Sequence, residues 1–235
     1  MRHARLDHWS RGTSFVHRRH PAAKIAATLV LLICIATLKP DHWRVGLAYL
    51  VLLCVFTLVA RLPLASVLRA ASVVLPFAIV FALFSVIARD VERGLAIVAR
   101  AYLSGMSTVL LMATTSQPDL LAGLETLRAP RFLIQVMQFL YRYLLVLMEE
   151  AGTMRDAARS RAGRSRLLEF RRAAAAAGVL FARSSARANA IHLAMTARGF
   201  IGHIPRFRIL TFSGADVYLL AAVMLPAIGL RLLAL

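Results

Sequence analysis

Long apolar runs separated by short polar connections dominate the hydrophobic pattern of this chain. Five runs approach or reach the length of about 20 residues that a bilayer-spanning helix needs. They cover residues 24–38, 45–60, 67–88, 95–115 and 215–234. Pro76 and Pro226 lie within two of these runs, where we treat them as tolerated kinks. The pattern predicts an all-α integral membrane protein with about five transmembrane helices.

The stretch between the fourth and the last of these runs predicts helices of another kind. A short helix is expected over 118–128, because Pro118 suits a first helical turn and Pro130 follows the end. Two long helices are expected over 132–162, ended by Gly163, and over 167–198, with Gly199 as a C-terminal cap. We therefore expect three parts: transmembrane helices 1–4 in 1–116, a cytoplasmic module of one short and two long helices in 117–212, and a last transmembrane helix in 213–235.

Composition supports the membrane class. The 235 residues are 60% hydrophobic with a mean hydropathy of +0.70, whereas soluble domains are closer to half apolar. The formal charge of +18 comes from basic residues that lie mostly between the apolar runs. A nucleic-acid partner is not expected, because a basic patch of that kind needs a soluble domain to carry it. Cys34 and Cys54 lie inside apolar runs and indicate no disulfide framework.

The charge distribution predicts the topology. Residues 1–24 carry six Lys/Arg and one Asp, so the N-terminus should be cytoplasmic. Residues 150–212 carry twelve Arg against three acidic residues, a net charge of +9. A sixth apolar run, 132–149, would place this segment outside if it crossed the membrane, against the positive-inside rule. We therefore expect 132–149 to begin a helix that stays at the cytoplasmic side.

Two short motifs end the two long predicted helices: Ala158-Arg159-Ser160 and Ala197-Arg198-Gly199. If the helices run antiparallel or cross, these tips lie tens of ångströms apart. Arginine offers five donors in a rigid fork and suits carboxylates and helix C-terminal carbonyls in a socket. Two similar tips held apart indicate a partner with two equivalent sockets. One such motif alone would more simply complement a helix dipole.

The chain resembles the transmembrane T component of energy-coupling factor transporters, the EcfT/CbiQ family. That family carries two Ala-Arg-Ser or Ala-Arg-Gly motifs at the ends of cytoplasmic coupling helices. Other stretches agree in order along the chain: His17 through Pro21 to Lys24, Thr114-Thr115-Ser116-Gln117-Pro118-Asp119, Arg142-Tyr143 followed by Glu149-Glu150, and Ala194-Met195 leading to Gly199-Phe200. The Ser14, His17, Pro21 and Lys24 entry is most similar to the cobalt/nickel, CbiQ-like branch.

The resemblance implies a transporter subunit in the bacterial inner membrane that couples two ABC ATPases to a substrate-capture (S) membrane subunit. ATP and Mg²⁺ would be bound by the ATPases, and this chain would carry no cofactor, metal or catalytic residue. Arg159 and Arg198 would enter grooves on the ATPases, while their small neighbours shape the tips: Ala158, Ser160, Ala197 and Gly199. Secondary contacts are expected from Arg161, Arg164, Arg142, Glu149 and Glu150. Arg161, Arg164 and Arg166 suit phospholipid headgroups equally well.

Sites for other chemistry are sparse in the sequence. There is no G-x-x-x-x-G-K-[ST] phosphate loop and no H-E-x-x-H cluster. The acidic residues are expected outside the apolar runs, with no membrane-embedded pair. A lipid or isoprenoid enzyme would have only Glu149, Glu150 and His192 to use, in no known motif. That enzyme, a polybasic membrane scaffold and a vitamin importer (biotin, for example) remain the alternatives.

The fourth apolar run holds one charged residue and one small-residue pair of interest. Arg100 is expected to reach the membrane interface or a partner helix. Ala101 and Gly105 form a small-xxx-small pair that favours close helix contact, either internal or with the capture subunit.

Overall fold

A computed structural model describes residues 14, 16–17, 19–39, 43–160, 166–200, 202 and 213–232, with the backbone alone for 166–169. Every regular element in these residues is helical, as predicted. The elements are α2 (Pro21–Ala36), α3 (Trp43–Val59), α4 (Leu64–Ala71), the 3₁₀ helix η1 (Ser72–Val74), α5 (Leu75–Ile87), α6 (Val91–Thr114), α7 (Gln117–Thr126), α8 (Arg131–Ser160), α9 (Arg166–Ala197) and α10 (Gly214–Leu232). The chain forms two compact units, residues 1–128 with 210–235 and residues 129–209.

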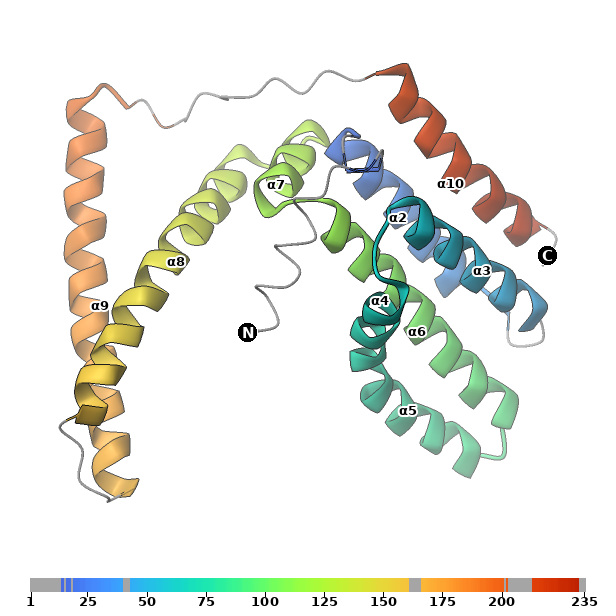
Figure 1. The fold of residues 1–235 in the computed structure, drawn as a ribbon, viewed down its shortest axis with the longest axis horizontal. Helices are drawn as coiled ribbons and strands as arrows, with labels where there is room; N and C mark the ends of the chain where they lie inside the picture. The colour runs from blue at the N-terminus through green and yellow to red at the C-terminus, as the bar shows by residue number, and fades with distance from the viewer. Residues whose placement is uncertain are drawn as a thin grey trace. The chain divides into compact units, whose positions relative to one another are not determined.

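Helix α6 is the centre of the first unit. It packs against α2, α3, α4 and α5, and α10 lies beside α2 and α3 (Figure 1). The largest side chains that are fully buried, Tyr49, Ile35, Met106 and Val67, come from four of these helices. The Tyr49 hydroxyl donates to the carbonyl of Ala227 at 2.7 Å and so joins α3 to α10. This bond satisfies a phenol that would otherwise be buried without a partner.

The outer surface of this unit is apolar. Phe77, Phe81 and Phe84 on α5 are all more than 60% exposed, as side chains facing lipid would be. By length and composition, four helical stretches could cross a membrane: Leu64–Ile87, Val91–Thr114, Arg131–Ser160 and Gly214–Leu232. Helices α2 and α3 are apolar but shorter, at 16 and 17 residues. The number of crossings therefore stays a prediction.

The predicted run 67–88 is one helical path in three pieces. Pro76 lies in the first turn of α5, directly after η1. Proline has no N–H to donate to the carbonyl four residues earlier, which accounts for a tightened 3₁₀ turn at this point. Gly105 of α6 lies against this turn, because a Cβ there would come within 3.2 Å of Val74. At Gly105, the close contact expected of the Ala101/Gly105 pair is thus internal.

The second unit is an antiparallel pair of long helices. Helix α8 has 30 residues and α9 has 32, close to the predicted lengths. Met154 and Ala158 of α8 line one groove with Ala173 and Leu180 of α9. Tyr143 and other earlier residues of α8 line a second groove with later residues of α9, up to Met195. This opposite order establishes the antiparallel arrangement seen in Figure 1.

Candidate functional site

The first arginine motif forms the exposed end of α8. Arg159 and Ser160 are exposed, whereas Ala158 is half-buried and faces the groove shared with α9. The Ser160 hydroxyl donates to the carbonyl of Ala157 at 2.9 Å, which satisfies one of the free carbonyls of the last turn. The small residue before Arg159 thus faces the partner helix, while Arg159 lies exposed at the rim of the same groove.

Two further arginines accompany the first motif. Arg155 of α8 and Arg172 of α9 line the same groove as Arg159. Among the described residues, one terminal nitrogen of Arg172 is buried and has no hydrogen-bond partner. Alanines 173, 176 and 177 form much of the groove wall opposite α8. The first tip is therefore a strongly cationic surface built from both helices.

The second motif is a helix-ending structure. The N–H of Gly199 donates to the carbonyl of Thr196 at 3.0 Å, and the N–H of Phe200 donates to the carbonyl of Met195 at 3.0 Å. These two bonds and the φ of +79° at Gly199 define a Schellman cap. Glycine is favoured here because a Cβ is strained at positive φ. The cap that was predicted at Gly199 is confirmed, and it leaves Arg198 exposed at the end of α9.

An apolar contact completes this second tip. Phe200 and Met195 line one groove together with Phe139 and Tyr143 of α8, and such a contact commonly accompanies a Schellman cap. Unlike the first tip, this one places exposed Arg198 next to a mainly apolar groove.

Glu150 holds the two long helices together. Its carboxylate accepts from Arg183 at 3.1 Å and from Arg187 at 3.3 Å, both on α9. The carboxylate is only 17% exposed. Glu150, expected as a secondary partner contact, is therefore engaged within the chain. The tips at Arg159 and Arg198 lie at opposite ends of the pair, separated by roughly the length of α9, about 46 Å.

The other expected secondary contacts differ in their surroundings. Arg142 is exposed and lies 5.9 Å from the ring of Tyr143, and Glu149 is exposed. Arg161 and Arg164 lie outside the described residues. Helix α8 also exposes a row of large apolar side chains within its own unit, including Phe132, Leu140, Leu144 and Met148.

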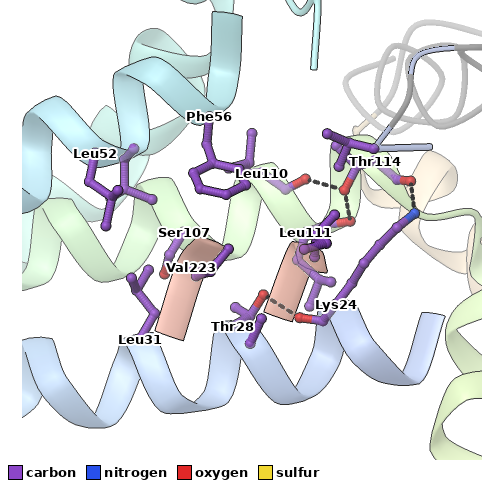
Figure 2. A pocket seen from close by; sticks show the side chains of 14 residues that line it. Lys24, Thr28, Leu31, Leu52, Phe56, Ser107, Leu110, Leu111, Thr114 and Val223 are labelled. Atoms are coloured by element: carbon purple, nitrogen blue, oxygen red, sulfur yellow. Dashed lines mark hydrogen bonds between the residues drawn. The ribbon is translucent and has the colours of Figure 1, made fainter. Parts of the chain in front are cut away.

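A buried lysine forms a polar clasp that was not predicted as a site from the sequence. Lys24, in the first turns of α2, is 5% exposed. Its ammonium donates to the carbonyl of Thr114 at 2.9 Å and to that of His17 at 3.1 Å. Figure 2 shows the side chain running along a small apolar pocket to the end of α6. The ammonium thereby satisfies a carbonyl at the end of α6, close to the point where α7 begins.

His17 and Asp216 extend the clasp to α6 and α10. His17 Nε2 donates to the carbonyl of Ala113 at 3.3 Å, so Nδ1 accepts from the Ser14 hydroxyl at 2.6 Å. Asp216, 3% exposed, accepts from the backbone N–H groups of His20 and Ser213 at 3.0 and 2.8 Å. The expectation that acidic residues lie outside the apolar runs is therefore wrong at Asp216. Its two N–H donors explain how a carboxylate is held there.

Helix α7 packs on this clasp. Ser116 caps α7 by accepting from the N–H of Asp119, and its hydroxyl donates to the Asp119 carboxylate at 2.6 Å. Gly123 lies against α2, where a Cβ would come within 2.9 Å of Pro21 and Ile25. The short helix predicted over 118–128 is confirmed, and it packs with the apolar helices of the first unit. Lys24, Thr114 and Asp216 are 90 or more residues apart, so only the isolated charges of Lys24 and Asp216 at the starts of two apolar runs could have signalled the clasp.

The described residues contain no group of three or more His, Cys, Asp or Glu side chains that could hold a metal ion. The fold and its surface define an all-helical membrane protein. A family model described as cobalt transport protein, CbiQ, matches residues 12–207. The chain belongs to this family of transport proteins.

Two curated relatives agree with the family. Over 116 residues, 48% of this chain, it is 34% identical to an uncharacterized protein of Methanocaldococcus jannaschii, covering 43% of that protein. Over 113 residues, again 48% of this chain, it is 33% identical to the cobalt transport protein CbiQ of Rhodobacter capsulatus, covering 46% of that protein. The chain thus spans a little under half the length of either relative.

Proposed function

We propose that this chain is the coupling (T) subunit of an energy-coupling factor importer. In this proposal, Arg159 and Arg198 each enter a socket on one of two ABC ATPase subunits. The chain transmits the ATP-driven movement of these subunits to a small membrane protein that captures the substrate. ATP and Mg²⁺ belong to the ATPases, and this chain performs no chemical step itself.

One observation carries the proposal: a single helix pair presents an exposed arginine at each of its two ends. Two ATPase subunits that close and open around ATP would move two such tips relative to each other. The Glu150 pair with Arg183 and Arg187 would let the helices move as a connected body. Family membership supports a role within a transport complex.

The remaining surfaces suit the other contacts of such a complex. The exposed apolar row on α8 supports docking of the capture subunit, since an uncovered apolar face of this size favours a partner or lipid. The clasp at Lys24 and the packing of Gly123 on α2 would hold α7 firmly on the apolar unit. The net charges of +5 in 1–24 and +9 in 150–212 favour a cytoplasmic N-terminus and coupling module in the bacterial inner membrane.

Cobalt is the substrate that we propose, with nickel as its close chemical relative. The support is the family description and the printed name of the Rhodobacter capsulatus relative. The metal ion would be cargo held by the capture subunit. A vitamin importer, for biotin as an example, is the alternative, and the identity of the co-purified capture subunit would decide between them.

The test is co-purification of the tagged chain with its native membrane partners, followed by an ATPase assay. We would compare the native chain with Arg159→Lys, Arg198→Lys and the double variant. Lysine keeps the charge but loses the bidentate fork. We therefore expect each single variant to co-purify with about tenfold less ATPase protein, and the double variant to co-purify with none.

Arg93→Lys is the matched control, because Arg93 is an exposed arginine outside the α8/α9 pair. It should retain the partners normally. Full partner retention and coupled ATPase activity in the double lysine variant would instead favour a polybasic scaffold, for which charge alone suffices. Absence of any ATPase from the native preparation under mild conditions would contradict the proposal.

A further inference from the structure

A large cleft lies on the first unit between the end of α2, the start of α3 and the first half of α6. Its volume is about 700 Å³. The walls are mainly apolar and come from side chains such as Leu47, Leu50, Leu95 and Ala99. Leu47 and Leu95 are more than half exposed, so the chain itself leaves these walls uncovered.

Arg100 gives this apolar cleft a cationic centre. It is half-buried and lies nine residues into α6, about 14 Å along the helix from Val91. Within the described part of the chain, its Nε is buried and has no hydrogen-bond partner. A buried guanidinium nitrogen without an acceptor is costly. The Arg100 guanidinium therefore needs a hydrogen-bond acceptor, and a negatively charged acceptor would bind it most strongly.

The charges around the cleft favour an anion with an apolar body. Lys39 lines the cleft with Arg100, and Arg44 lies 5.7 Å from the ring of Trp43, another lining residue. Glu92 is the one acidic side chain among the lining residues. The side chain of Arg100 points back toward the start of α6, which is the end where Lys39 and Trp43 lie. Arginine, lysine and tryptophan near a helix end are typical of the headgroup region of a bilayer.

We propose that this cleft binds an anionic phospholipid, with the phosphate at Arg100 and Lys39 and an acyl chain along the apolar walls. Charge complementarity selects the headgroup, and the apolar walls select a lipid over a free anion. The site is independent of the two arginine tips, which lie in the other unit. A bound lipid would fill a surface between α3 and α6 that the protein leaves open.

The test is native mass spectrometry of the full chain released from nanodiscs that contain phosphatidylglycerol and phosphatidylcholine with identical acyl chains. The native chain should retain phosphatidylglycerol preferentially. Arg100→Gln should reduce that retention about tenfold, because a charge-assisted hydrogen bond is lost, and Arg100→Lys should be intermediate. Arg93→Gln removes the same charge from an exposed position outside the cleft, where Arg93 pairs with Asp90, and should change nothing.

A second variant fills the cleft without altering charge. Ala99→Phe places a ring among the apolar walls and should displace the lipid. It therefore tests the proposal separately if Arg100→Gln does not fold. Equal retention of both lipids by the native chain, or unchanged retention in both Arg100→Gln and Ala99→Phe, would overturn the proposal. Displacement of phosphatidylglycerol by inorganic phosphate alone would also overturn it, because the acyl chain would then contribute nothing.

Discussion

At the scale of single residues, the second arginine motif combines two physical roles in three positions. Gly199 supplies the positive φ that ends α9, and the cap fixes where Arg198 leaves the helix. Phe200 then returns to the groove beside Met195. The glycine of the motif is therefore explained by backbone geometry, before any partner is considered. The arginine is exposed, so the fold alone gives no reason for its identity.

Gly199 and Gly178 offer a matched pair for testing this account. A Cβ at either position meets no atom within 4 Å, so only the backbone differs between them. We expect Gly199→Ala to lower the free energy of unfolding by about 1 kcal/mol, because alanine is strained at a φ of +79°.

The control is Gly178→Ala, inside α9, which should raise the same free energy by up to about 1 kcal/mol. Reversible unfolding of the full chain in detergent, followed by circular dichroism, would measure both changes. Equal effects of the two substitutions would contradict the cap as the reason for Gly199.

At the scale of elements, the sequence predicted the helices more completely than the contacts that join them. The apolar runs and Gly199 predicted the long helices to within a few residues, and Pro118 predicted the start of the short one, because propensity, caps and breakers are local. The end predicted at Gly163 lies outside the described residues. The clasp at Lys24 was missed because its partners, the carbonyls of His17 and Thr114, are backbone atoms that leave no pattern in the sequence. The role of Glu150 was missed for a similar reason, since Arg183 and Arg187 are more than 30 residues away.

Glu150 should set the rigidity of the helix pair. We expect Glu150→Gln to weaken both ion pairs with α9, at a cost of about 1 kcal/mol, since the arginines are 41% and 60% exposed. The measurement is the distance between spin labels at exposed positions 157 and 196, near the two tips, with Cys34 and Cys54 replaced. The native pair should give a narrow distribution near about 45 Å.

Glu150→Gln should broaden this distribution toward other separations. The control is Glu149→Gln, since Glu149 is the exposed neighbour of Glu150 on α8. An unchanged distribution in Glu150→Gln would mean that packing in the two grooves, and not the ion pairs, holds the helices together.

At the scale of the whole molecule, α8 poses a question that helix geometry alone leaves open. It is long and apolar enough to cross a membrane, yet it leads into a segment with a net charge of +9. The two criteria oppose each other, because hydropathy favours insertion of 132–149 and the positive-inside rule opposes export of residues 150–212. We expect the positive-inside rule to dominate, because residues 150–212 carry twelve arginines against three acidic residues, whereas the helix over 132–149 is only moderately apolar.

Cysteine accessibility would resolve which of the two criteria dominates. In a chain without Cys34 and Cys54, we expect Ser160→Cys, at the exposed end of α8, to resist a membrane-impermeant maleimide in intact spheroplasts and to react after permeabilisation. Ala88→Cys, at the exposed turn between α5 and α6, should react from outside in both cases and serves as the control. Labelling of Ser160→Cys from outside would mean that α8 crosses the bilayer. Both arginine tips could not then face cytoplasmic ATPases as proposed, because the strongly basic stretch after α8 would begin on the wrong side of the membrane.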